Sequence, residues 1–286
     1  MTLNRCVVAA WFVVAGVSVA GAQVAPQDDA GHGLIALPAP SLLDQATTAV
    51  TQPDPAGPDL DAPRRGFFSE MFHGMFDAVK HMPRRNTLYW LGGGAALALA
   101  VHPEDKDIND RLKGSSIADT AYKPGKYIGS LPVLFATATT TYIVGRAGDH
   151  PRARHLGMDM IQATLLSEVI TESIKVSVRR KRPLHDDGTR NSGYAFPSGH
   201  STMTFAVATV LQQHLGWKAA VPTYAIAAYV ATSRLHDNRH YASDVVMGAA
   251  NGIIIGRSIT WHGRNYYASA LPVPGGVGVG VQVGAP

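Results

Sequence analysis

The chain has 286 residues, of which only 16% are charged while 46% are apolar. Soluble domains carry roughly a quarter charged residues, so this composition predicts a large buried core, a surface that contacts a membrane, or both. Residues 63–286 hold 24 Lys and Arg against 15 Asp and Glu. Such a basic domain suits anionic ligands. Because no nucleic-acid-binding motif is present, we expect phosphate esters or anionic headgroups as ligands, and no nucleic acid.

The first 22 residues are typical of a secretory signal peptide. Arg5 supplies the positive charge, residues 6–19 are apolar, and Ala20-Gly21-Ala22 resembles a cleavage site. We therefore expect export to the periplasm, with an uncleaved membrane anchor as the alternative. The only cysteine, Cys6, lies in this segment. The mature chain would then have no thiol, which excludes a disulfide, a Cys-ligated zinc and a cysteine nucleophile.

Composition divides the rest of the chain into three parts. Residues 23–65 are rich in Pro, Ala and Asp and predict a disordered leader, because they offer little apolar surface to bury. Residues 66–265 carry the helical patterns and are the expected catalytic domain. In the Gly/Val-rich tail at 266–286, Val alternates with Gly or Gln. That alternation predicts either a short strand or a disordered tail.

Apolar residues recur at helical spacing through most of residues 66–265, which predicts an all-α fold. We expect a bundle of about six core helices with the active site between them. The stripe at 66–82 fits a helix packed on the core or one lying on a membrane surface. No segment has the ~20 mainly apolar residues of a convincing span, yet a soluble bundle and an integral membrane bundle both fit. Further helices are predicted at residues 87–101, 127–145, 155–180, 199–215, 218–234 and 242–261, with irregular chain at 103–125.

The first block of candidate site residues is Lys175 followed seven positions later by Arg182. Seven residues are nearly two helical turns, so both side chains are expected on one helix face, with Pro183 ending the helix. Lys and Arg that converge on one point hold an oxyanion. We expect Arg179, Arg180 and Lys181 to point elsewhere. A solvated basic helix end is the alternative for this block.

The second block is Pro197-Ser198-Gly199-His200. Ser198 precedes an apolar-periodic run and predicts a helix N-cap. The amides at a helix N-terminus attract anions, and His200 would lie in the first turn beside them. A capped helix with a surface histidine is the alternative.

The third block is Ser233-Arg234, then His240 and Asp244. His240 and Asp244 are four apart, which would make them neighbours on a helix face. A carboxylate that accepts from one imidazole nitrogen leaves the other nitrogen free to attack. A local ion-pair cluster with His236 and Asp237 is the alternative.

Together, in this order, the three blocks resemble the signature of the type 2 phosphatidic acid phosphatase superfamily, which includes bacterial class A acid phosphatases and vanadium haloperoxidases. The resemblance covers residues 85–262 and implies an α-helical fold with the site between helices. It also implies that His240 is a nucleophile that forms a phosphohistidine, that Asp244 orients it, and that His200 protonates the leaving group. The remaining implied role is phosphate binding, by Lys175, Arg182, Arg234 and the amides of Ser198 and Gly199.

The expected function is hydrolysis of phosphate monoesters or lipid phosphates, with no metal and no cofactor. The alternatives are a vanadate-dependent haloperoxidase, since the same residues bind vanadate in that group, and a non-catalytic phosphate-binding relative. The motifs specify the phosphate and leave open whether a lipid or a small soluble group carries it. Contact with a membrane surface is expected if the apolar helices face lipid.

Overall fold

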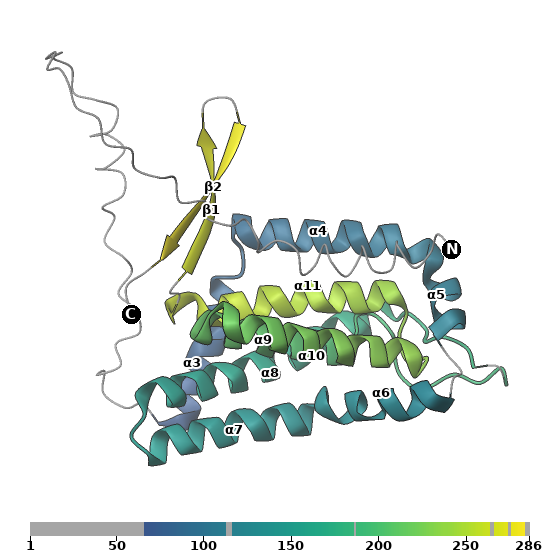
Figure 1. The fold of residues 1–286 in the computed structure, drawn as a ribbon, viewed down its shortest axis with the longest axis horizontal. Coiled ribbons are helices and arrows are strands. Elements are labelled where there is room, and N and C mark those ends of the chain that lie inside the picture. Colours follow the sequence, from purple (N-terminus) through teal and green to yellow (C-terminus); the bar gives the residue numbers. More distant parts are fainter. Residues whose placement is uncertain (1–65, 113–115, 186, 264–265, 274–275, 284–286) are drawn as a thin grey trace, which may run out of the picture. The chain divides into compact units, whose positions relative to one another are not determined.

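The computed structural model describes residues 66–112, 116–185, 187–263, 266–273 and 276–283 (Figure 1). The signal peptide and leader expected at 1–65 lie outside the described residues. The described helices and strands are α3 (Phe67–Lys80), α4 (Arg85–Val101), η1 (His102–Glu104), α5 (Asp105–Leu112), α6 (Ser116–Ile128), α7 (Leu131–Ala147), α8 (Pro151–Val178), α9 (Gly199–Leu215), α10 (Trp217–His236), α11 (Ala242–Ile259), η2 (Thr260–Gly263), β1 (Tyr266–Val273) and β2 (Gly276–Val283).

The predicted all-α fold is confirmed, and most of the predicted helices are present within a few residues of their expected ends. The irregular chain expected at residues 103–125 was wrong, since α5 and most of α6 occupy it. The polar residues of α5 suggested irregular chain, but they are not all exposed to solvent. Asp105 and Asn109, four positions apart, are 4% and 3% exposed, because they bond to residues of the site described below.

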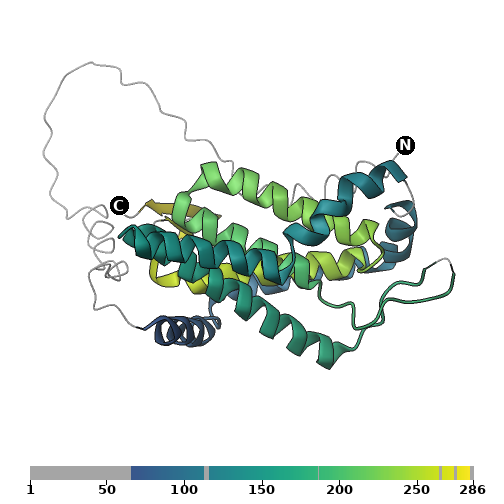
Figure 2. The same cartoon turned by 90° about the horizontal axis from the view of Figure 1, so that it is seen from below.

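Helix α9 lies at the centre of the bundle, with α8, α10 and α11 packed against it (Figures 1 and 2). Gly248, Gly252 and Gly256 face α9 at successive turns of α11. A Cβ at Gly248 would lie 2.7 Å from the Ser198 carbonyl oxygen, and one at Gly256 would lie 2.7 Å from that of Ala206. Because only glycine fits there, the two backbones approach closely, which brings the start of α11 against the start of α9.

The stripe on α3 has two apolar faces. Met71 is buried, and Phe67 and Met75 pack against the core of the bundle. Phe68, Phe72 and Phe76 are 69%, 61% and 62% exposed. The core interpretation therefore holds for one face only, and the other leaves three phenylalanine rings in contact with solvent.

By length and composition, no single described helix qualifies as a membrane span, although Ala118–Ile128 and Leu131–Ala147, bent by 53° between them, qualify as a pair. In the C-terminal tail, the strand expected from the alternating valines is β2. It pairs with β1 in an antiparallel hairpin, with Tyr266 opposite Val283.

Candidate active site

The N-terminus of α9 is capped as predicted. Ser198 is fully buried, and its hydroxyl oxygen accepts hydrogen bonds from the amide of Ser201 at 3.5 Å and from its hydroxyl at 3.1 Å. The Ser198 amide donates to the carbonyl of Asp244 at 3.0 Å. That amide is therefore engaged within the protein, which corrects its expected role in phosphate binding. A Cβ at Gly199 would lie 3.7 Å from Nζ of Lys175, so the lysine reaches the capped helix end.

Helix α8 ends earlier than predicted, which changes the position of Arg182. The helix stops at Val178, and Arg179 has φ 53°, in the left-handed region. Lys175 and Arg182 are therefore not on one helix face. Arg182 follows in a loop, where its Nε donates to the carbonyl of Tyr194 at 3.4 Å. Burial lowers the pKa of Arg182, and the positive charge of Arg239 adds to this effect.

Arg180, which we expected to point away from the site, is part of it. Its Nη1 donates to Oδ1 of Asp244 at 2.5 Å and to the hydroxyl of Ser243 at 2.7 Å. Its Nη2 donates to Oδ2 of Asp105 at 2.7 Å. Burial opposes the charge on Arg180, but Asp244 and Asp105 outweigh burial and raise its pKa. The prediction was wrong because the left-handed turn at Arg179 redirects the chain that follows α8.

Asp105 completes this ion-pair network. Its Oδ1 accepts from the amide of Ser243 at 2.8 Å, and its Oδ2 accepts from the Ser243 hydroxyl at 2.6 Å. Burial opposes its charge, yet the bonds from Ser243 and Arg180 prevail and lower the pKa of Asp105. The carboxylate on α5 therefore holds the first turn of α11 in place together with Arg180. No pattern in the sequence marked Asp105, which lies far along the chain from both partners.

His240 lies just before α11 and is 4% exposed. Its Nδ1 lies 2.7 Å from the carbonyl oxygen of Ala195 and 3.8 Å from Oδ2 of Asp244. Since a carbonyl only accepts, Nδ1 carries the proton and Nε2 keeps its lone pair. The acceptor that sets the tautomer is therefore the Ala195 carbonyl, whereas we had assigned that role to Asp244. The backbone oxygen of His240 also accepts from Nδ2 of Asn109 at 3.0 Å.

Asp244 is fully buried at the third position of α11. Its Oδ2 accepts from the amide of Tyr241 at 2.8 Å and so caps the helix. The expected placement of His240 and Asp244 on one helix face was wrong, because the helix begins only at Ala242. Burial lowers the pKa of His240 and the charge of Arg182 lowers it further, while Asp244 opposes both. The resting imidazole is thus favoured in its neutral form.

Arg234 and His200 complete the arrangement. Arg234 is 4% exposed, and its Nη2 donates to Oδ2 of Asp237 at 2.6 Å. Nε2 of His200 lies 3.2 Å from the carbonyl oxygen of Lys126 and therefore carries a proton. Burial, followed by the charge of Arg234, lowers the pKa of His200 to about 4.

The predicted residues come together in the fold although they lie on α8, the loop after it, the start of α9, α10 and the start of α11. His200 is within the electrostatic influence of Lys175, Arg234 and His240, and His240 is within that of Arg182 and Asp244. The candidate active site consists of Lys175, Arg182, Ser198, Gly199, His200, Arg234, His240 and Asp244, with Arg180, Asp105, Asn109 and the Ala195 carbonyl as neighbours that the sequence did not indicate. Among the described residues, the one group of side chains with the spacing of metal ligands lies elsewhere.

Residues 156–267 match the PAP2 superfamily model, and this range contains all eight predicted site residues. This part of the chain is similar to the PAP2 superfamily. The family resemblance of the three motifs is thereby confirmed. The network that joins α5 to α11 through Asp105 reaches outside the matched range.

Two curated proteins that are similar to this chain carry functional names. The chain is 41% identical over 90 residues to the lipid A 1-phosphatase of Porphyromonas gingivalis. This alignment covers 30% of this chain and 19% of that protein. The chain is also 37% identical over 103 residues to the decaprenylphosphoryl-5-phosphoribose phosphatase of Mycolicibacterium smegmatis. This alignment covers 34% of this chain and 55% of that protein. The matches therefore span less than two thirds of each relative's length.

Two solved structures resemble this chain at low identity. The transmembrane PAP2-type phosphatidylglycerolphosphate phosphatase from Bacillus subtilis is 18% identical with a TM-score of 0.47, and the alignment covers 68% of this chain and 94% of that one. Aquifex aeolicus LpxE is 24% identical with a TM-score of 0.47, and the alignment covers 55% and 94%.

Proposed function

We propose that this protein is a phosphoric ester hydrolase that acts through a phosphohistidine at His240, without a metal ion in the reaction. The observation that supports this most is the state of His240. Its Nδ1 proton is held by the Ala195 carbonyl at 2.7 Å, and burial lowers the pKa of the imidazole. Nε2 therefore keeps a lone pair for attack, beside cations that would hold a phosphate.

In the proposed first step, Nε2 of His240 attacks phosphorus, an N–P bond forms and the P–O bond to the leaving group breaks. Protonated His200 gives its proton to the leaving oxygen. The imidazole becomes cationic in this step, and the negative charge of Asp244, 3.8 Å from Nδ1, stabilises it. Arg180 positions Asp244 through their 2.5 Å contact and touches no reacting atom in this scheme.

In the second step, the neutral His200 accepts a proton from a water molecule as the water oxygen attacks phosphorus. The N–P bond breaks, its electrons return to Nε2, and phosphate leaves. His200 is protonated again and the cycle closes. One histidine thus serves as acid and then as base, which requires its protonation state to change at each step.

The positive charges hold the phosphoryl group in this proposal. Lys175, Arg182, Arg234 and the amide of Gly199 would bind the three equatorial oxygens, while Ser198 acts as the cap of α9 that positions the amide. Phosphoryl transfer depends mainly on positioning and charge stabilisation. The two arginines can each bind two oxygens in one plane, whereas Lys175 contributes a point charge.

We further propose that the substrate is a lipid phosphate at a membrane surface. The named relatives are phosphatases of lipid A and of decaprenylphosphoryl-5-phosphoribose. The chain also exposes apolar side chains on several helices, including Phe68 and Phe72 on α3 and Trp217 and Val221 on α10. Exposed apolar residues that lie together mark interaction sites, and Phe68, Phe72 and Phe76 lie one helical turn apart on α3. Export to the periplasm by the segment at 1–22 is part of the same proposal.

The test is phosphate release from an aryl phosphate and from phosphatidic acid in detergent micelles, each with and without EDTA. We expect release from both, a higher kcat/KM on the lipid, and no change of initial rate with EDTA. His240→Ala should abolish turnover while circular dichroism stays unchanged. A wild-type rate in His240→Ala would refute the mechanism, and no release from either substrate would refute the activity and favour the non-catalytic alternative.

A further inference from the structure

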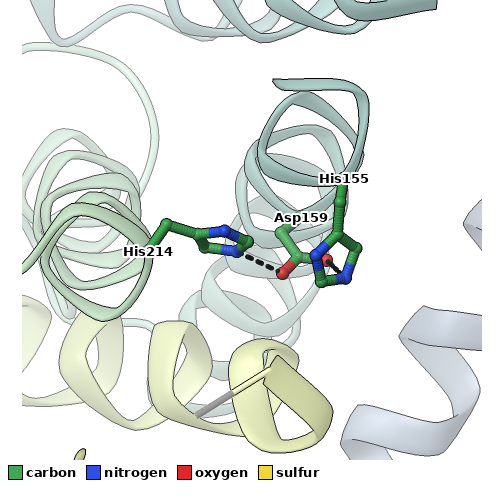
Figure 3. Close-up of side chains that lie close together, drawn as sticks. All are labelled: His155, Asp159 and His214. Atoms are coloured by element: carbon green, nitrogen blue, oxygen red, sulfur yellow. Dashed lines mark hydrogen bonds and ion pairs between the residues drawn. The ribbon is translucent and has the colours of Figure 1, made fainter. Parts of the chain in front are cut away.

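A second group of ligating side chains lies between α8 and α9, far from the candidate active site. His155 and Asp159 are one turn apart on α8, and His214 is in the last turn of α9 (Figure 3). Asp159 and Lys175 are separated by 16 residues of α8, which is about 24 Å at the rise of an α-helix. This group therefore takes no direct part in the proposed phosphoryl transfer.

The buried carboxylate lies between the two imidazoles. Asp159 is 1% exposed, while the side chains of His155 and His214 are 14% and 11% exposed. Nε2 of His214 lies 2.8 Å from Oδ2 of Asp159, and Nε2 of His155 lies 3.7 Å from Oδ1. Figure 3 shows both rings directed at the carboxylate from two helices. The ring centroids are 5.0 Å apart at an interplanar angle of 61°.

We propose that His155, Asp159 and His214 form a structural zinc site that ties the N-terminal part of α8 to the C-terminal end of α9. One nitrogen or oxygen atom from each residue lies within 4.8 Å of those from the other two. Ligand atoms around a tetrahedral zinc are about 3.3 Å apart, given zinc–ligand distances of about 2.0–2.2 Å. The ligand atoms therefore need to approach one another by no more than about 1.5 Å, and water would supply the fourth ligand.

The chemistry of the donor set favours zinc over calcium or magnesium. Two imidazoles and one carboxylate are ligands typical of zinc, whereas calcium and magnesium prefer oxygen ligands only. A divalent cation would also offset the negative charge of Asp159 in its buried position. Because the ligands come from two helices, bound metal would stabilise the folded state and leave the chemistry at His240 unchanged.

The experiment uses the full chain without a polyhistidine tag, first stripped of metal and then titrated with Zn²⁺ or with Co²⁺ as a visible-absorption probe. The variants are His155→Gln, His214→Gln and Asp159→Asn. His150→Gln is the matched control, because His150 is exposed and lies at the start of the same helix. We expect one ion per chain and a higher Tm with Zn²⁺ in wild type and His150→Gln, and neither effect in the three site variants.

Phosphate release by His214→Gln at low temperature should equal that of wild type, which shows that the variant folds and that its active site is intact. His155→Gln provides the same comparison on α8 should Asp159→Asn fail to fold. The proposal is overturned if wild type binds no stoichiometric metal, or if His155→Gln and His214→Gln bind it as wild type does. A failure here leaves the proposed phosphatase activity untouched.

Discussion

The guanidinium of Arg180 bridges two buried carboxylates, Asp244 on α11 at 2.5 Å and Asp105 on α5 at 2.7 Å. Asp244 also caps α11 through the amide of Tyr241 and accepts from the amide of Ser198 through its backbone carbonyl. This one aspartate therefore joins the starts of α9 and α11 and lies beside the proposed nucleophile. Arg180 controls where that carboxylate is held, and this is why its position matters for the site.

Arg180→Ala is expected to lower both stability and activity, because it leaves the charges of Asp105 and Asp244 buried without their partner. Breaking a buried pair on one side costs about 3–5 kcal/mol of unfolding free energy. Thermal denaturation and phosphate release measure the two effects. Lys181→Ala is the control, since Lys181 is exposed on the adjacent position. If Asp105→Ala rescues part of the lost stability in the double variant, the network is responsible. Equal behaviour of Arg180→Ala and Lys181→Ala would contradict this role.

Arg182→Lys should reduce kcat by about 10²–10³, which is the scale for removing one preorganised donor from an oxyanion site. Lysine keeps the charge but loses the planar pair of donors. Arg182 is the cleaner of the two arginine positions, because Arg234 also forms an ion pair with Asp237 at 2.6 Å. Steady-state kinetics on the aryl phosphate are the measurement. A change confined to KM would show that Arg182 binds the substrate equally well in the ground state and in the transition state.

The rate should depend on pH differently for the free and the substrate-bound enzyme. In the free site, burial and then Arg234 lower the pKa of His200 to about 4. A bound phosphate brings negative charge and should raise it, so protonated His200 would persist to higher pH. We expect the alkaline limb of kcat to lie at higher pH than that of kcat/KM. His200→Asn should lose the alkaline limb that His200 causes, while the ionisations of His240 and of the substrate still affect the rate.

Stability should fall as the pH drops from 6.5 towards 4, because the unfolded chain protonates His200 in this range and the folded chain does not. The unfolded state then binds more protons, so stability rises with pH through this window. The full shift corresponds to about 3 kcal/mol. Thermal melts at a series of pH values measure it. His200→Asn should flatten this dependence, and an unchanged slope would show that His200 does not cause it.

Replacement of Phe68, Phe72 and Phe76 by serine should weaken binding to phospholipid vesicles at least tenfold. These rings are more than half exposed, and burying one such side chain contributes about 1.5–3 kcal/mol. The opposite face of α3 remains packed, so circular dichroism should not change. His73→Ser, at another exposed position of α3, is the control in a vesicle flotation assay. Equal flotation of the triple variant and wild type would show that this face does not contact lipid.

Local features of the site could be predicted from the sequence. The cap at Ser198 and the helix that follows it depend on neighbouring residues, and side chains at short separations along the chain carry that information. The three blocks likewise resemble a phosphatase signature, and that resemblance predicts phosphate binding by residues that lie in short stretches of the chain. The all-α class followed from the apolar period, which each helix expresses within its own length.

The tertiary structure decided the contacts between distant segments. The Ala195 carbonyl sets the tautomer of His240, and a backbone group of this kind leaves no trace in a side-chain motif. Arg180 enters the site because α8 stops at Val178 and Arg179 adopts a left-handed conformation, which helical periodicity does not encode. The contacts of Asp105, and the grouping of His155 and Asp159 with His214, form only when separate helices pack together. Sequence patterns report which face a helix buries, whereas the packing of helices determines which polar groups meet there.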